Sequence, residues 1–156
     1  MNTYHATVDW QNNGEDFTDQ KYSRRHRWRF SNGVVINASA SPQIVPEPYS
    51  DTSAVDPEEA FVASLASCHM LWFLSLVADN GHVVQRYRDE AEGFMDKNPE
   101  GKLAIIKVIL RPVVQFADNH APSRQQYDVL HQKAHQRCFI ANSVKTDIHI
   151  DAQLGQ

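Results

Sequence analysis

Hydrophobic and polar residues alternate in the first forty positions, and this pattern predicts short strands. Residues 4–10 place Tyr, Ala, Val and Trp at every second position, which is typical of a half-buried strand. Residues 26–30 alternate in the same way, and Asn32-Gly33 predicts a tight hairpin turn before the apolar residues 34–36. The chain is therefore expected to begin with three strands.

A long helix is predicted to follow this sheet. Asp56 is suited to cap it, Pro57 suits its first turn, and Glu59 occupies the acidic position of a capping box. The pattern continues to about Asn80, and Gly81 is a natural stop. Both sides of this helix are apolar, so we expect it to be buried nearly all round, by a sheet, a second helix or a partner subunit.

The second half of the chain predicts two longer strands, a second helix and a closing strand. The strands cover about residues 83–95 and 103–116, and the closing strand covers 144–150. Ser123 begins the second helix, where Gln126 completes a capping box. Apolar residues recur on it at steps of three and four: Tyr127, Leu130, Ala134 and Cys138. The order β-β-β-α-β-β-α-β predicts an α+β fold, with one domain over residues 1–156.

Composition narrows the function classes. The chain has 156 residues and a net charge of −4, from 19 acidic and 15 basic side chains. That balance argues against nucleic-acid binding, and the basic cluster at residues 24–29 is interpreted as one exposed strand face. The longest apolar run, about residues 70–78, is roughly half of the ~20 residues that a membrane span needs. With no signal-like start, a cytoplasmic location is expected, and no membrane partner.

Two cysteines carry the candidate chemistry. Cys68 lies midway along the first helix and Cys138 near the end of the second, both on expected core faces, so their thiols can meet across the core. In a reducing compartment such a pair is more often catalytic, metal-binding or redox-active than a structural disulfide. A Cys68 thiolate, stabilised by an arginine, would attack a peroxide to give a sulfenic acid. Cys138 would then condense with it to a disulfide, which an external dithiol would reduce.

The side chains around this pair indicate the substrate class. Apolar surroundings favour an organic hydroperoxide over hydrogen peroxide, and the candidate substrate-binding residues are all aromatic: Phe61, Trp72, Phe73 and Phe139.

Three other interpretations of the same residues stay open. Buried cysteines are often simple core residues. His131, His135 and Cys138 stand at i, i+4 and i+7, and with Cys68 they have a spacing that suits a metal ion. A non-catalytic protein that binds a small apolar ligand is the alternative from another class. A nucleophilic pair of Cys68 with the adjacent His69 is rejected, because neighbouring helical positions point about 100° apart.

Two segments give the chain a family resemblance. Residues 56–61, followed by Ala66-Ser67-Cys68, resemble the helix start and the Ala-x-Cys motif of the OsmC/Ohr proteins. Residues 134–138, followed by 142–148, resemble the second-cysteine helix of that family and its last strand. These proteins are thiol-dependent peroxidases of osmotic and organic hydroperoxide stress. With the order of elements, the resemblance covers essentially the whole chain.

The resemblance implies a fold, an assembly and roles for individual residues. It implies two long central helices in an intertwined homodimer, with Cys68 as the peroxidatic and Cys138 as the resolving thiol. The family's catalytic arginine best matches Arg24, in preference to Arg25 and Arg27, and its orienting glutamate matches Glu58. No metal, haem or flavin is implied, and the reductant of relatives is a lipoyl-type dithiol.

Geometry and two departures qualify this comparison. Along a straight helix Glu58 lies about 15 Å from Cys68, so it must act through the arginine, across a break in the helix or from a neighbouring subunit. Phe139 stands where many relatives have proline, and His69 where an apolar residue is common. These departures alter the pocket and indicate a divergent OsmC-like branch.

Overall fold

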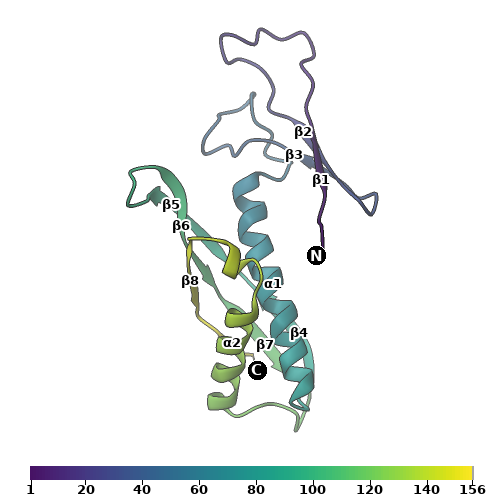
Figure 1. The fold of residues 1–156 in the computed structure, drawn as a ribbon, viewed down its shortest axis with the longest axis vertical. Coiled ribbons are helices and arrows are strands. Elements are labelled where there is room, and N and C mark those ends of the chain that lie inside the picture. Colours follow the sequence, from purple (N-terminus) through teal and green to yellow (C-terminus); the bar gives the residue numbers. More distant parts are fainter. Residues whose placement is uncertain (156) are drawn as a thin grey trace. The chain divides into compact units, whose positions relative to one another are not determined.

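The computed structural model describes residues 1–155 and shows a mixed α+β fold with two α-helices and three small sheets (Figure 1). The α+β class predicted from the sequence is confirmed. The chain forms two compact units, Met1–Ala60 and Phe61–Gln156. Helix α1, Pro57–Asp79, runs through the boundary between them. One domain over residues 1–156 therefore stays a prediction.

The first unit contains an antiparallel sheet in the order β1-β2-β3. Its strands are Ala6–Asp9, His26–Phe30 and Val35–Ala38. The predicted hairpin turn is present, and Gly33 adopts a φ of 86°, a conformation that favours glycine. All four residues of β1 are exposed. The prediction that this strand is half-buried is therefore wrong for the chain by itself.

Helix α1 begins and ends where the sequence predicts. The Asp56 carboxylate accepts the backbone N–H of Glu59 at 2.7 Å, and Gly81 follows the helix with a φ of 76°. Burial all round, however, is not observed, and Leu71 is 62% exposed. The buried residues of α1 lie along one side: Leu65, His69, Phe73, Leu76 and Val77. The opposite side of an apolar helix is thus left uncovered.

Among the described residues, α1 is the one helix long and apolar enough to span a membrane. The sequence-based expectation that no segment is long enough to span a membrane used only the continuous apolar run at residues 70–78, which is part of this helix. Length and composition alone are weak evidence, because the core helix of a soluble protein passes the same test.

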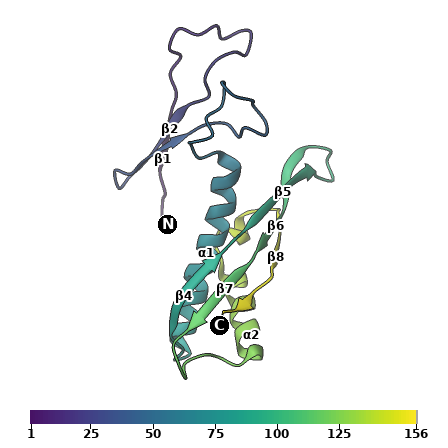
Figure 2. The same ribbon diagram turned by 180° about the vertical axis from the view of Figure 1, so that it is seen from behind.

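The two long strands predicted between the helices are one bent hairpin, and each half of it joins a different sheet (Figure 2). Strand β4 pairs with β7, and β5 pairs with β6. The bend falls at Pro112, which has no N–H to donate, and the preceding Arg111 donates its N–H to the Asp89 carboxylate at 2.7 Å. The four strands are Val84–Asp89, Glu92–Lys97, Leu103–Leu110 and Pro112–Phe116.

Helix α2, Arg124–Arg137, starts with the predicted capping box between Ser123 and Gln126. It ends one residue before Cys138, which was predicted to lie within the helix. The chain then forms a short 3₁₀ helix and two strands that pair in parallel with β6 and β7. These elements are η1 (Ala141–Ser143), β8 (Asp147–Ile150) and β9 (Gln153–Leu154).

The core of the second unit lies between α1, α2 and the bent hairpin. Phe73 of α1 contacts Tyr127 of α2 edge to face at 5.7 Å, and His69, one turn earlier, meets His131, one turn later. The two helices therefore pack antiparallel. Helix α1 also lies close to β5, because a Cβ atom added to Gly93 of β5 would lie 2.6 Å from Cγ2 of Val62 on α1.

Candidate functional site

The two cysteine side chains contact each other. Cys68 is half-buried midway along α1, and Cys138 is 1% exposed and is the C-cap residue directly after α2. Both thiols are free. Burial, together with a smaller contribution from a hydrogen bond with the Cys68 side chain, raises the pKa of Cys138 to about 11. The Ala141 N–H, 3.4 Å from Cys138 Sγ, acts in the opposite direction. At neutral pH Cys138 is therefore a protonated thiol.

The aromatic residues expected near the thiols occupy different environments. Trp72 and Phe139 meet edge to face at 5.4 Å, and Phe139 is 66% exposed. Phe61 is half-buried beside the core cluster of Leu65, Val108 and Leu110. Phe73, in contrast, is fully buried and lies in the core. In the described chain, Trp72, Phe139 and Phe61 have exposed surface for a ligand and Phe73 does not.

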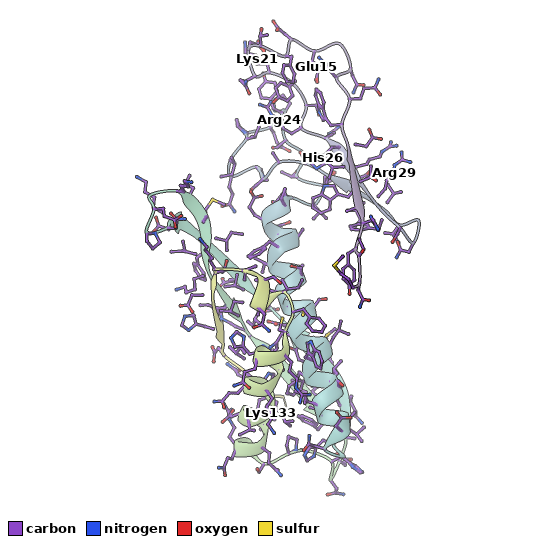
Figure 3. All side chains as sticks on the ribbon, viewed as in Figure 1. Glu15, Lys21, Arg24, His26, Arg29 and Lys133 are labelled. Carbon is purple, nitrogen blue, oxygen red and sulfur yellow. The ribbon has the colours of Figure 1, made fainter. Side chains whose placement is uncertain are left out.

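Arg24 lies in the long loop between β1 and β2 of the first unit, which also carries Glu15 and Lys21 (Figure 3). Its guanidinium lies 3.8 Å from the centre of the Tyr22 ring and donates to the carbonyls of Gln20 and Tyr22, each at 2.6 Å. No carboxylate pairs with Arg24 among residues 1–155. This cation therefore keeps its charge unneutralised.

The two other candidate arginines differ from Arg24. Arg25 forms an ion pair with Asp51 at 2.9 Å, and hydrogen bonds from Ser53, then Arg25, hold the pKa of the Asp51 carboxyl below its usual range. Arg27 lies exposed on β2, opposite Asp9 and Asn37. Of the three, Arg24 is both partly buried and without an acidic partner in the part of the chain described, which favours the sequence-based choice.

Glu58, in the first turn of α1, has a carboxylate oxygen that is buried without a hydrogen-bond partner. No ion pair links it to Arg24 within the described part of the first unit. The structure thus unites the two thiols in one unit and places Arg24 and Glu58 in the other.

A buried histidine pair joins α1 to α2, and it was not predicted from the sequence. His69 Nε2 and His131 Nδ1 share a hydrogen bond of 2.9 Å, and the two rings are 1% and 3% exposed. The His131 ring also stacks on Phe73, with 4.0 Å between centres. A polar residue in the apolar helix and another on the core stripe of the second helix were the available signals.

Burial sets the protonation of this pair. It lowers the pKa of His69 to about 4, with a smaller contribution from His135. It lowers the pKa of His131 to about 3, with smaller contributions from His69 and Arg124. Both imidazoles are therefore neutral at pH 7. Each has a second ring nitrogen that is buried without a partner.

The metal interpretation is not supported by the geometry. Within the described residues, no group of three or more His, Cys, Asp or Glu side chains is arranged to hold a metal ion. His131 instead bonds to His69, and Cys138 lies beyond the end of the helix that was expected to align it with His131 and His135.

A second feature missed from the sequence is Arg137, the last residue of α2 and the neighbour of Cys138. Its guanidinium carbon lies 5.7 Å from the centre of the Trp72 ring. This cation–π contact joins the last turn of α2 to α1, close to the thiols.

The chain belongs to the OsmC-like protein family, whose model matches residues 50–153. An OsmC-like protein of unknown function from Vibrio cholerae has 48% sequence identity and a TM-score of 0.96, over 98% of this chain and 100% of that one. A comparison with curated proteins gave no significant match.

More distant structures share the fold. An organic hydroperoxide resistance protein from Elizabethkingia anophelis has 14% identity and a TM-score of 0.71, over 100% of this chain and 97% of its own. The organic hydroperoxide resistance protein OhrB of Bacillus subtilis has 15% identity and a TM-score of 0.62, over 98% of each chain. The resemblance to OsmC/Ohr proteins found in the sequence is thereby confirmed.

The buried histidine pair predicts a loss of stability in acid. In the unfolded chain each imidazole regains a pKa near 6.5, so between pH 6.5 and about 4 the unfolded state binds more protons than the folded state. The free energy of unfolding should therefore decrease as the pH is lowered across this window, by up to about 1.4 kcal/mol per pH unit for each proton. Urea unfolding at a series of pH values measures this slope.

The control is the double variant His69→Leu, His131→Phe, in which acidic side chains still titrate but the pair is gone. The groups facing the pair, His135, Tyr127 and Arg124, are unchanged in it. Equal slopes for the two proteins above pH 4 would contradict the prediction.

Proposed function

We propose that this protein is a thiol-dependent peroxidase that reduces organic hydroperoxides, and hydrogen peroxide less well. The contact between the Cys68 and Cys138 side chains is the observation that supports it most directly. Family membership and the hydroperoxide resistance proteins among the structural relatives support the same class. A cytoplasmic location, which would keep a reducing dithiol at hand, is part of the proposal.

The proposed cycle has three steps. The Cys68 thiolate attacks the outer oxygen of ROOH; the O–O bond breaks, and after proton uptake an alcohol leaves and Cys68 is a sulfenic acid. Cys138 attacks the Cys68 sulfur, forming an S–S bond and releasing water that carries the sulfenic hydroxyl and the Cys138 proton. An external dithiol then exchanges with the disulfide, is itself oxidised, and restores both thiols.

The unequal environments of the two thiols support this order. Cys138 is buried with a raised pKa, so it is protonated and a poor first nucleophile at neutral pH. Cys68 is half-buried and so more accessible to a substrate. Once Cys68 is a sulfenic acid, attack by Cys138 is intramolecular, and proximity compensates for its weak ionisation.

Arg24 is proposed as the group that stabilises the Cys68 thiolate and orients the peroxide, with Glu58 as its orienting acid. Two observations support this proposal. The Arg24 guanidinium has no acidic partner in its own unit, and one Glu58 carboxylate oxygen is buried without a hydrogen-bond partner. A guanidinium also hydrogen-bonds to peroxide oxygens. Phe61, Trp72 and Phe139 are proposed to contact the organic part of the substrate.

A homodimer is proposed because each unit leaves apolar residues uncovered. In the second unit, the exposed side of α1 carries Ala63 and Leu71. In the first unit, Tyr4 and Val8 are 88% and 66% exposed in or beside an alternating strand. A second copy of the chain would cover both surfaces, and exposed apolar residues on one side of a helix are a common feature of subunit interfaces.

Replacement of each cysteine should separate the steps. Cys68→Ser should abolish hydroperoxide consumption, because the attacking sulfur is gone. Cys138→Ser should consume one equivalent and then stop with a sulfenic acid on Cys68 that dimedone traps. Peroxide assays with and without a lipoyl-type dithiol, together with thiol counting, measure both outcomes. Full dithiol-dependent turnover by Cys68→Ser refutes the assignment, and two unchanged thiols in the native protein favour an apolar-ligand binder.

Matched arginine variants should identify the catalytic cation. Arg24→Lys should lower the rate constant of the first oxidation by about 100-fold, because an ammonium lacks the planar fork of two parallel N–H donors that a guanidinium can present to the peroxide. Arg25→Lys retains a charge beside Asp51 and should react like the unaltered protein. Stopped-flow oxidation gives the rates, and the pH dependence of alkylation gives the Cys68 pKa. A larger loss in Arg25→Lys would transfer the role to that residue.

The proposed dimer should have twice the 17.8 kDa mass of the chain in sedimentation equilibrium. Leu71→Asp should shift it toward the monomer, because a carboxylate would be buried without a partner. Gln132→Asp, on the exposed side of α2, is the control and should stay dimeric. A single-chain mass for the unaltered protein at micromolar concentration would rule out the dimer.

A further inference from the structure

The histidine pair links α1, which carries Cys68, to α2, which leads into Cys138. His69 follows Cys68 on α1, and His131 lies two turns before Cys138 on α2. Both rings are almost completely buried, and among the described residues the bond between them is the only side-chain hydrogen bond that either ring makes. The peroxidase chemistry proposed above makes no use of this pair.

The protonation of the pair makes its geometry restrictive. In two neutral imidazoles, one facing nitrogen carries the proton and the other accepts it. Breaking the bond would leave both rings buried with no partner at all, because their outer nitrogens already lack one. A slide of one helix along the other by a single residue is about 1.5 Å, which would lengthen the 2.9 Å contact and turn the two ring nitrogens out of line.

The packing around the pair fixes the rings as well as the bond. The His131 ring is stacked on Phe73 of α1 and meets Tyr127 edge to face, with 4.5 Å between centres. A bond between rings that cannot turn freely therefore favours the observed register of the two helices. A disulfide has similar demands, since the Cα atoms of its cysteines must lie within about 4.4–6.8 Å.

We propose that the His69–His131 hydrogen bond is a positioning device: it fixes the register of α1 against α2 and thereby holds Cys138 within bonding reach of Cys68. Its role in turnover rests on the proposed function, because there the Cys68–Cys138 disulfide is an intermediate. The bond favours the disulfide step and leaves the attack on peroxide unaffected.

The test is a thiol–disulfide equilibrium that needs no peroxide. The full-length protein is equilibrated with glutathione disulfide, so that the protein dithiol and one glutathione disulfide give the protein disulfide and two glutathiones. The equilibrium constant is the effective concentration of Cys138 at Cys68. His131→Phe retains a ring on Phe73 but removes the bond, and it should lower this constant about tenfold.

Two further variants separate the bond from the ring and from general stability. His131→Asn loses the ring but places an amide atom where Nδ1 was, so it should retain most of the effective concentration. Tyr127→Phe removes a different hydrogen bond of the same cluster, to the Gln153 carbonyl at 2.9 Å, and should leave the constant unchanged while lowering the melting temperature. If His131→Phe does not fold, His69→Leu and His69→Gln replace the two His131 variants.

Each result decides the question. An equilibrium constant that is lowered in His131→Phe but retained in His131→Asn supports the positioning role. Three results would each overturn the positioning role. The equilibrium constant could be equal in all variants, it could fall equally in His131→Phe and His131→Asn, or Tyr127→Phe could lower it as much as His131→Phe does. A native protein that forms the disulfide with glutathione but ignores hydroperoxides would disprove the proposed function and leave this inference intact.

Stopped-flow measurements on the same variants show which step depends on the bond. With an alkyl hydroperoxide, His131→Phe should form the Cys68 sulfenic acid at the native rate and convert it to the disulfide about tenfold more slowly. A slower first step with an unchanged second step would contradict the proposed role.

Discussion

The contact between α1 and α2 is the interaction on which the candidate site depends. Each helix brings one cysteine, and their antiparallel packing places the two thiols together although they are far apart in the sequence. The contact is made by aromatic rings, a pair of imidazoles and small aliphatic side chains, with the bent hairpin behind them. Close packing of this kind leaves little freedom to slide, since interiors are nearly as dense as organic crystals.

Within that contact the two sulfurs have different environments. Burial disfavours the charged form of Cys138, whereas Cys68 keeps some exposure at the middle of its helix. A symmetrical pair would give either sulfur the first reaction. The asymmetry follows from where each residue lies, one within a helix and one at the end of another, and it is set by the fold rather than by neighbouring residue types.

Much of the fold was predictable from the sequence because its local signals are strong. The Asp56 cap, the Ser123–Gln126 capping box and the Asn32-Gly33 turn each depend on a few adjacent residues, and all three form as expected. The bend of the hairpin at Pro112 was missed, because the apolar pattern continues through it and only pairing with two different sheets reveals the break.

The site was predictable in part. The approach of Cys68 and Cys138 was predicted from two core-facing helical positions, although Cys138 lies one residue beyond the end of α2. The bond between His69 and His131 depends on a helix register that periodicity alone does not define. Arg24 and Glu58 were chosen by resemblance, and the division of the chain into two compact units at residue 60 had no signature in the sequence.

The position of Cys138 at the end of α2 has one more consequence. Its backbone is extended, with φ −65° and ψ 111°, and the next residues form a short 3₁₀ turn tied back to it by the Asn142 N–H. Because Cys138 lies just outside α2, its backbone does not have to keep helical torsion angles. In the proposed cycle, the disulfide could form and break at this position while the hydrogen bonds inside α2 stay as they are.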